Sequence, residues 1–263
     1  MFINWGIESY KWKLSLLLLE DIPFTKAFRS VLAGCSITML TPNRIGEYGG
    51  RILYLKEENR LTGISVTILG SISQLLMTML MGTLALVSVS QSSIAEMAPW
   101  MGGVLLVISI TTSLVLLLIF FKVAAVVQVL ERMPFTKKIV KHLLVLKLYS
   151  RKLLLRILFL SFLRYIVFIL QYILMLNVME VNIPFTECFF LIAIFYLVLA
   201  IAPTAGFIEL PVRALASVQI FSLISSNTIG IQAAALAIWM INLVLPAIIG
   251  SIMIFGVKIL KGR

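Results

Sequence analysis

The sequence predicts an all-α polytopic membrane protein. Of its 263 residues, 61% are hydrophobic and only 13% are charged, whereas soluble domains carry roughly a quarter charged residues. The mean hydropathy is +1.09, and several apolar stretches are long enough to cross about 30 Å of hydrocarbon as helices. These observations predict about five transmembrane helices. An internal repeat, described below, adds two re-entrant helical hairpins in inverted orientation.

Four spans are predicted directly from apolar length. They cover residues 61–90, 101–121, 157–178 and 231–256. The third of them contains one internal charge, Arg164. Residues 1–19 form the less clear fifth helix, because three charged residues interrupt it; they are Glu8, Lys11 and Lys13. This segment lacks the basic, apolar and small-residue order of a secretory signal peptide.

An internal repeat organises the chain. The tetrapeptide IPFT occurs at 22–25 and again at 183–186, an offset of 161 positions (residue 183 against residue 22). Further residues match in this register, with one residue inserted after the proline: Pro42 with Pro203, Glu47 with Glu209 and Arg51 with Arg213. Such self-similarity indicates two copies of one structural unit.

The repeat divides a single membrane domain, 1–263, into two halves. Repeat 1 covers 1–100 with a hairpin at 22–58, and repeat 2 covers 101–263 with a basic loop at 122–156 and a hairpin at 183–225. Repeat 2 has a span upstream of its second helix that repeat 1 lacks. We therefore expect the chain to be shortened or to start late, with residues 1–19 as most of the second helix of repeat 1.

The basic loop at 122–156 is expected to be cytoplasmic by the positive-inside rule. It contains nine Lys or Arg residues and His142 against one acid, Glu131. The cations are Lys122, Arg132, Lys137, Lys138, Lys141, Lys147, Arg151, Lys152 and Arg156. Leucines interleaved with cations are typical of an interfacial amphipathic helix on an anionic leaflet. A topology anchor without lipid specificity is an equally good interpretation.

Charge also predicts the orientation of the two hairpins. The first is surrounded by six cations, namely Lys26, Arg29, Arg44, Arg51, Lys56 and Arg60, whereas the second has only Arg213. The first hairpin should therefore open to the cytoplasm and the second to the outside. The basic tail, with Lys258, Lys261 and Arg263, places the C-terminus in the cytoplasm. We expect a multi-pass protein of a prokaryotic cell membrane.

Each hairpin is predicted to reverse at a proline and glycines. The helix before Pro42 or Pro203 has about fifteen or sixteen residues, roughly 22 Å and short of a full span. Proline ends the helix and glycine permits the tight turn, here Gly46 and Gly206. Irregular backbone at membrane depth survives only when buried in protein or lining a watery cavity. The glycines at 46 and 50 should serve close packing within the hairpin rather than dimerisation.

The hairpins carry the candidate lipid-binding residues. Glu47 and Arg51 are four apart and should share a helix face, as should Glu209 and Arg213, although Pro211 predicts a looser second pair. A purely structural role as ion pairs is the alternative, but charges within a membrane favour function. The candidate lipid-binding residues are Arg44, Glu47, Arg51, Glu209 and Arg213.

Charge counting predicts the ligand. Arg44 is left over when the two glutamate–arginine pairs cancel, and a spare arginine near helix N-termini favours a phosphate. A lipid with a phosphate headgroup is the natural candidate for a chain with so little outside the membrane. Glu8 and Lys11, three apart, either line the same cavity or pair within the bundle.

Other chemistry finds no support in the sequence. His142 lies among lysines and should face solvent or headgroups, while Cys35 and Cys188 stand alone in apolar surroundings as packing residues. No nucleotide-binding, zinc or nucleophile motif is present. We expect no metal, no cofactor, no nucleic acid partner and no ATP-driven transport.

Four segments resemble the lysylphosphatidylglycerol synthase transmembrane, or flippase-like, family of bacterial and archaeal membrane proteins. They are NWGIESYKWKLSLL, TPNRIGEYGGR, GSISQLL and APTAGFIELPVR. The resemblance implies a flippase module for modified lipids, here without the soluble aminoacyl-transfer domain of some relatives. The second loop departs from the glycine-rich pattern, with Ala205, Phe207 and Pro211.

The expected function is therefore non-enzymatic translocation of an anionic or phosphate-linked lipid, by a flippase or scramblase. One alternative is a non-transporting membrane partner that organises a lipid-modifying or glycosyl-transfer enzyme through the basic loop. A membrane enzyme using Glu47 and Glu209 as acid and base ranks last, because no nucleophile or metal cluster accompanies them.

Overall fold

The computed structural model describes residues 1–39, 41, 45–90, 103–201 and 209–261, and these fold almost entirely into helices. The longer helices are α1 (Phe2–Leu16), α2 (Phe24–Met39), α3 (Ile45–Ile52), α4 (Arg60–Ser90), α6 (Val104–Phe121), α9 (Arg151–Val178), α10 (Phe185–Ile201), α11 (Glu209–Phe221), α12 (Thr228–Trp239) and α13 (Leu245–Lys261). The described residues contain no strand. The all-α fold class is confirmed.

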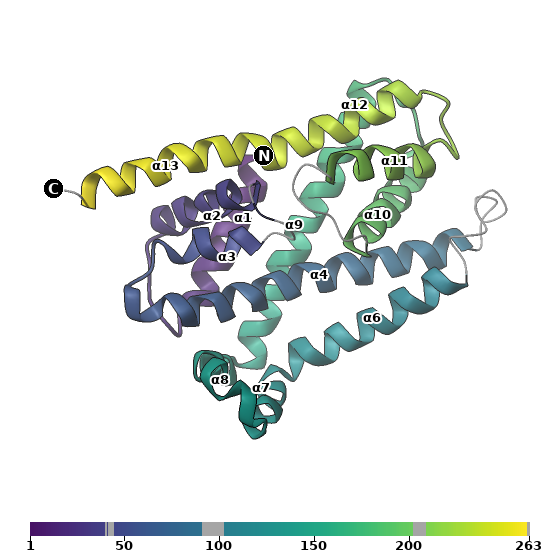
Figure 1. Cartoon of the computed structure of the whole chain (residues 1–263). Coiled ribbons are helices and arrows are strands. Elements are labelled where there is room, and N and C mark those ends of the chain that lie inside the picture. The colour runs from purple at the N-terminus through teal and green to yellow at the C-terminus, as the bar shows by residue number, and fades with distance from the viewer. Residues whose placement is uncertain (40, 42–44, 91–102, 202–208, 262–263) are drawn as a thin grey trace.

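Shorter elements fill the connections. They are the 3₁₀ turn η1 (Glu57–Asn59), the basic-loop elements α7 (Val123–Arg132), η3 (Pro134–Thr136), α8 (Lys137–Leu143) and η4 (Leu144–Leu148), and the π-helical segment η6 (Met240–Val244). In Figure 1, α4 and α6 run side by side, and α7 and α8 lie together at one end of the pair.

Four helices of the described residues are long and apolar enough to cross a membrane. They cover Glu57–Val89, Val104–Phe121, Arg151–Val178 and Thr228–Ile254. The fifth expected helix is α1, whose fifteen residues rise roughly 22 Å, less than the hydrocarbon thickness. The chain is therefore a multi-pass membrane protein in which α1 is packed among longer helices rather than spanning alone.

A proline shapes the last span. Pro246 cannot donate a backbone hydrogen bond, and its ring crowds the carbonyl four residues earlier. The π-helical segment Met240–Val244 lies directly before it. This wider turn lets α12 and α13 continue as one long rod (Figure 1). It also turns the Asn242 side chain toward the bundle interior, where only 9% of the residue is exposed.

The first hairpin is built on glycine contacts. A Cβ on Gly50 would lie 2.5 Å from Ala33 O of α2, and one on Gly46 would overlap Ile37 O. On its other side, α2 meets α13, where a Cβ on Gly250 would overlap Leu32 O. Because only hydrogen fits at these three positions, α2 lies in backbone contact with both neighbours. Gly46 and Gly50 therefore pack within the chain.

Each hairpin has its two ends tied together. Glu20, before α2, accepts hydrogen bonds from Lys56 N (3.1 Å) and Asn59 Nδ2 (3.2 Å), after α3. Partial burial by itself raises the pKa of Glu20, but these hydrogen bonds and Lys26 lower it by a larger amount. The pKa of Glu20 therefore lies below its usual value. The stabilisation that these contacts give to the charged Glu20 is therefore lost as pH falls through the lowered pKa of this carboxyl group. In the second hairpin, Asn227 Nδ2 donates to Met179 O at 3.1 Å.

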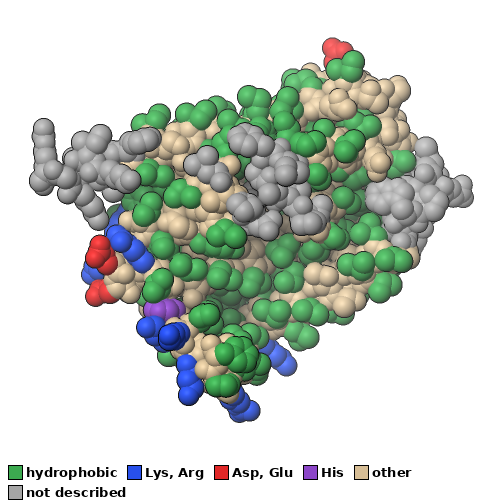
Figure 2. Space-filling view, viewed as in Figure 1, with side chains coloured by type: hydrophobic (Ala, Val, Ile, Leu, Met, Phe, Trp, Pro, Cys, Tyr) green, Lys and Arg blue, Asp and Glu red, His purple; other side chains and the backbone are tan. Residues whose placement is uncertain are grey.

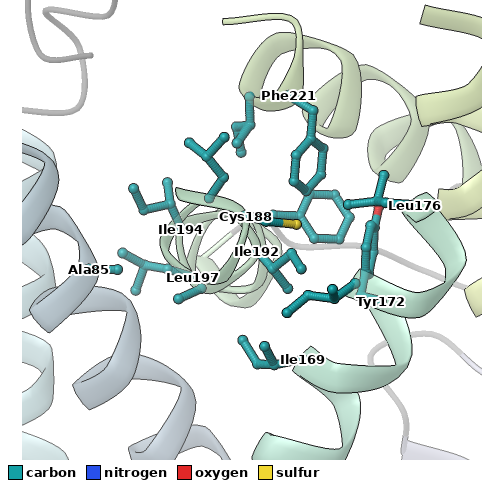
Figure 3. Packing of buried hydrophobic residues seen from close by; sticks show 14 of the residues in the cluster. Ala85, Ile169, Tyr172, Leu176, Cys188, Ile192, Ile194, Leu197 and Phe221 are labelled. Carbon is teal, nitrogen blue, oxygen red and sulfur yellow. The ribbon is translucent and has the colours of Figure 1, made fainter. Parts of the chain in front are cut away.

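The largest apolar cluster surrounds α10. Figure 3 shows Ile192, Leu197 and Cys188 of α10 packed among side chains of α4, α9 and α11, including Tyr172 and Phe221. A helix that is apolar on all sides must be buried on all sides or face lipid. The two cysteines, Cys35 and Cys188, are both buried and free of disulfides.

The glycine contacts predict that alanine substitutions at two neighbouring glycines, Gly50 and Gly49, differ sharply in their effect on stability. Gly50→Ala should destabilise the protein by about 1–3 kcal/mol, because its methyl group meets backbone that cannot move aside. Gly49→Ala is the matched control, since nothing lies within 4 Å of a Cβ there. Thermal unfolding in detergent measures both, and equal midpoints for the two variants would contradict the packing described here.

Candidate functional site

A buried carboxylate holds the centre of the molecule. Glu8 of α1 is 2% exposed and pairs with three cations from three helices. Its oxygens lie 2.9 Å from Lys11 Nζ, 2.7 Å from Arg51 of α3 and 2.8 Å from Arg164 of α9. Burying a charge is tolerated only with such pairing and hydrogen bonding. Glu8 thus joins α1, α3 and α9 at one point.

A second carboxylate completes this group. Glu47 pairs with Arg51 one helical turn away, as the spacing predicts. We call these five residues the Glu8 cluster: Glu8, Lys11, Glu47, Arg51 and Arg164. Within the described residues the cluster has three cations and two carboxylates, so it is formally positive.

Polar side chains extend the cluster to α4 and to the π-helical segment. Arg164 Nε donates to Asn4 Oδ1 at 2.7 Å, and Asn4 donates to Asn242 Oδ1 at 3.0 Å. Lys11 Nζ donates to Gly70 O (3.3 Å) and to Ser161 Oγ (3.2 Å). These hydrogen bonds fix the positions of the charges on Lys11 and Arg164.

Aromatic rings orient the two arginines. The guanidinium carbon of Arg164 lies 5.3 Å from the ring centre of Trp5 and 5.2 Å from that of Phe168. Arg51 lies 5.5 Å from the ring centre of Trp12. Cation–π contacts strengthen away from water, so the rings of Trp5 and Phe168 help to hold the Arg164 guanidinium in place.

The cluster opens onto a cavity of about 700 Å³. It is lined by Glu47 of the first hairpin, together with Lys11 of α1 and Arg164 of α9. On the side of the second hairpin it is lined by Glu209 and Arg213. Arg51 is not among the lining residues. The volume is in the range of ligand pockets, and its walls combine apolar side chains with a few charges.

The second hairpin presents its own ion pair to this cavity. Arg213 Nε donates to Glu209 Oε1 at 2.8 Å. The expectation of a loosened pair around Pro211 is wrong, because α11 begins at Glu209 and proline is tolerated in the first helical turn. Both hairpins thus carry the same glutamate–arginine arrangement.

Two tyrosine hydroxyls at the cavity have no partner among the described residues. Tyr165 and Tyr196 both line the cavity, and their hydroxyl oxygens are buried without a hydrogen bond. The rings of the two residues lie 6.3 Å apart, edge to face. An unmade buried hydrogen bond costs about 1–3 kcal/mol, so each hydroxyl is an unsatisfied donor in a residue that borders the cavity.

The sequence-predicted residues divide into three groups. Six of them lie in or beside the cavity: Glu8, Lys11, Glu47, Arg51, Glu209 and Arg213. Glu8 and Lys11 fulfil both of the expected alternatives, because they line the cavity and also pair with each other. Gly46 lies at the α2–α3 contact. The remaining predictions, Pro42, Arg44, Pro203 and Gly206, fall outside the described residues.

Sequence reasoning missed Arg164 and Asn242 as members of the site. The signal for Arg164 was present, since a single charge inside an apolar span marks a functional position by default. Asn242 carried no comparable signal, because its inward position depends on the π-helical turn. No group of three or more His, Cys, Asp or Glu side chains suited to a metal occurs in the described parts of the chain.

Comparison with known proteins identifies one family. The model of the lysylphosphatidylglycerol synthase TM region matches residues 1–250, which is nearly the whole chain. No curated protein and no solved structure matches the sequence.

The Glu8 cluster makes a strong prediction for stability. Glu8→Gln removes the shared counter-charge of three buried cations and should cost about 3–5 kcal/mol. Glu47→Gln should destabilise the protein less, because the Glu47 side chain is 22% exposed and Arg51 still pairs with Glu8 in this variant. Unfolding midpoints of the purified variants in detergent test this order. Glu58→Gln, at an exposed acid of η1, serves as control, and a Glu8→Gln midpoint equal to that control would refute the central role of Glu8.

Proposed function

Because the chain belongs to the lysylphosphatidylglycerol synthase TM-region family, whose members are membrane proteins related to lipid flippases, we propose that it moves a lipid between leaflets. The lipid is anionic or phosphate-linked, and its headgroup passes through the cavity between the two hairpins. No ATP hydrolysis or covalent chemistry is involved. The protein lies in the cell membrane of a prokaryote with its C-terminus in the cytoplasm.

The observation that carries this proposal is the unequal charge of the Glu8 cluster. Its three cations and two carboxylates leave room for one more negative charge. Lys11 and Arg164 are the cations of the cluster that line the cavity, so an entering phosphate would meet them. Charge-assisted hydrogen bonds to phosphate are the strong ones, above all from the planar guanidinium group of arginine.

Arg44, the arginine expected to meet the lipid, keeps that role as a prediction from sequence. The described residues add Lys11 and Arg164 as a second source of positive charge. The pairs Glu47–Arg51 and Glu209–Arg213 hold the hairpin helices that border the cavity.

The tyrosine hydroxyls support a ligand with several polar atoms. Tyr165 and Tyr196 can each donate one hydrogen bond to a phosphate or hydroxyl oxygen in the cavity. Around them the walls are aromatic, from Trp5, Phe168 and Trp239. Such walls suit the glycerol backbone and first acyl carbons next to a headgroup.

The hydrogen bonds that join the two ends of each hairpin support an alternating-access movement. Glu20 ties the ends of the first hairpin and Asn227 ties the ends of the second. Paired discontinuous helices at a central cavity are the usual arrangement in transporters with inverted repeats. In this proposal, the α2–α3 and α10–α11 hairpins are re-entrant, and rocking of the two halves exposes the cavity to each leaflet in turn.

A second candidate function rests on the basic loop. Its helix α8 exposes Lys137, Lys138 and Lys141, which could bind a lipid-modifying or glycosyl-transfer enzyme while the chain itself transports nothing. A transport assay separates the two candidates, because the second predicts no lipid movement by the purified protein.

Charge restoration tests the proposed transport. In liposomes with fluorescent phosphatidylglycerol, Lys11→Gln should slow movement roughly tenfold, the value of one charge-assisted hydrogen bond. Adding Glu47→Gln to Lys11→Gln restores the positive excess and should recover part of the rate. Chemical quenching of the outer leaflet measures both rates, and Lys122→Gln, on the exposed basic loop, is the control. A wild-type rate for Lys11→Gln would exclude this site.

The unpartnered hydroxyl of Tyr196 predicts opposite effects on stability and transport. Tyr196→Phe should raise the unfolding midpoint in lipid-free detergent, because it removes a buried hydroxyl that lacks a partner. The same change should slow lipid movement by several-fold, since one hydrogen bond to the headgroup is lost. Tyr10→Phe, at an exposed side chain of α1, is the matched control. A lowered midpoint for Tyr196→Phe would mean that the hydroxyl is already bonded within the protein.

A further inference from the structure

The segment 122–148, here called the basic platform, carries more positive charge than its own contacts need. Its one acid, Glu131, pairs with Lys147 at 2.5 Å. Five exposed cations have no acidic partner among the described residues: Lys122, Arg132, Lys137, Lys138 and Lys141. Figure 2 shows Lys and Arg side chains, in blue, gathered around and below the purple histidine at the lower end of the view. The platform therefore presents a strongly positive surface.

The same surface carries large exposed apolar side chains. Phe135 is 79% exposed and Ile139 is 64% exposed, and Lys137 and Lys138 lie between them in sequence. Leu148 and Val129 are also exposed. Water-facing apolar area costs about 25 cal/mol per Å², and a soluble loop of this size would not keep such residues together by chance.

The platform uses a different apolar face to attach to the protein. Val127, Val140 and Leu146 are buried in a cluster that includes Leu69 and Leu76 of α4. The hydroxyl of Tyr149, which follows the platform, donates to Ser15 O at the end of α1. With one apolar face docked, Phe135 and Ile139 still remain exposed, together with Leu148 and Val129.

The position of the platform identifies that occupant. It connects the end of the span Val104–Phe121 to the start of the span Arg151–Val178, so it lies where the hydrocarbon of a bilayer ends. Cations interleaved with apolar side chains at this depth match a surface of anionic lipids, where each Lys or Arg contributes about 1 kcal/mol. An acidic protein would satisfy the lysines but would leave Phe135 and Ile139 unexplained.

We propose that the basic platform lies in the headgroup layer of an anionic leaflet and inserts Phe135 and Ile139 below the phosphates. The lysines at 137, 138 and 141 then contact lipid phosphates from above. The site is separate from the central cavity and does not depend on lipid transport. It would couple the protein to the lipid charge of the membrane in which it resides.

A fluorescent probe at the tip of the platform tests this. Phe135→Cys can be labelled with an environment-sensitive dye in a Cys35→Ala, Cys188→Ala background, since both native cysteines are buried packing residues. In nanodiscs containing phosphatidylglycerol, the emission should shift to the blue and be quenched by nitroxides on the upper acyl chain. In nanodiscs of phosphatidylcholine alone, the shift should be markedly smaller.

Two further variants keep the test decisive. Replacing Lys137, Lys138 and Lys141 by Gln should abolish the difference between the two kinds of nanodisc. A dye at Glu58→Cys, on exposed η1, should report water in both. Emission from position 135 that reports water in phosphatidylglycerol, or that is equal in the two lipids, would overturn the proposal. A blue shift that needs an added protein would favour the enzyme-partner alternative and overturn it too.

Discussion

The structure depends on one carboxylate shared by three cations inside a membrane protein. Glu8 is too deeply buried to remain charged by itself. Because Lys11, Arg51 and Arg164 come from α1, α3 and α9, these helices meet at Glu8, and Arg51 has Glu47 as a second partner. The same cluster borders the cavity through Lys11, Glu47 and Arg164.

How much of this was predictable varies by feature. Apolar length and composition were sufficient for the all-α membrane fold and for the spans, because crossing hydrocarbon requires about twenty apolar residues whatever their neighbours. The i, i+4 pairs at Glu47 and Glu209 were likewise predictable from local helix geometry. The partnership of Glu8 with Arg164 was not, because the two residues are 156 positions apart and no local rule relates them. The role of Asn242 depends on a backbone irregularity caused by Pro246, which pattern reasoning treats only as a kink.

The two halves of the predicted repeat are chemically unequal. At the offset of 161 that relates the IPFT copies, Glu8 corresponds to Ile169, which is fully buried in the apolar cluster around α10. The first half therefore holds its hairpin by charge, and the second holds its hairpin mainly by aromatic and aliphatic packing, with Tyr172 and Phe221 stacked at 5.5 Å. Moving the first hairpin against α1 would separate the buried ions Glu8 and Arg51, and the pair of Glu8 with Arg164 joins the two halves. The second hairpin can slide against its apolar neighbours with little electrostatic cost.

The span of chain between Glu8 and Arg164 has a consequence for biosynthesis. When α1 leaves the ribosome, its glutamate and lysine have only each other, and Arg164 will not be made until 156 residues later. Insertion of a short helix with an incompletely neutralised acid is unfavourable. We therefore expect α1 to stay at the membrane surface at first and to enter the bundle after α9 has crossed, although α1 is synthesised before α9.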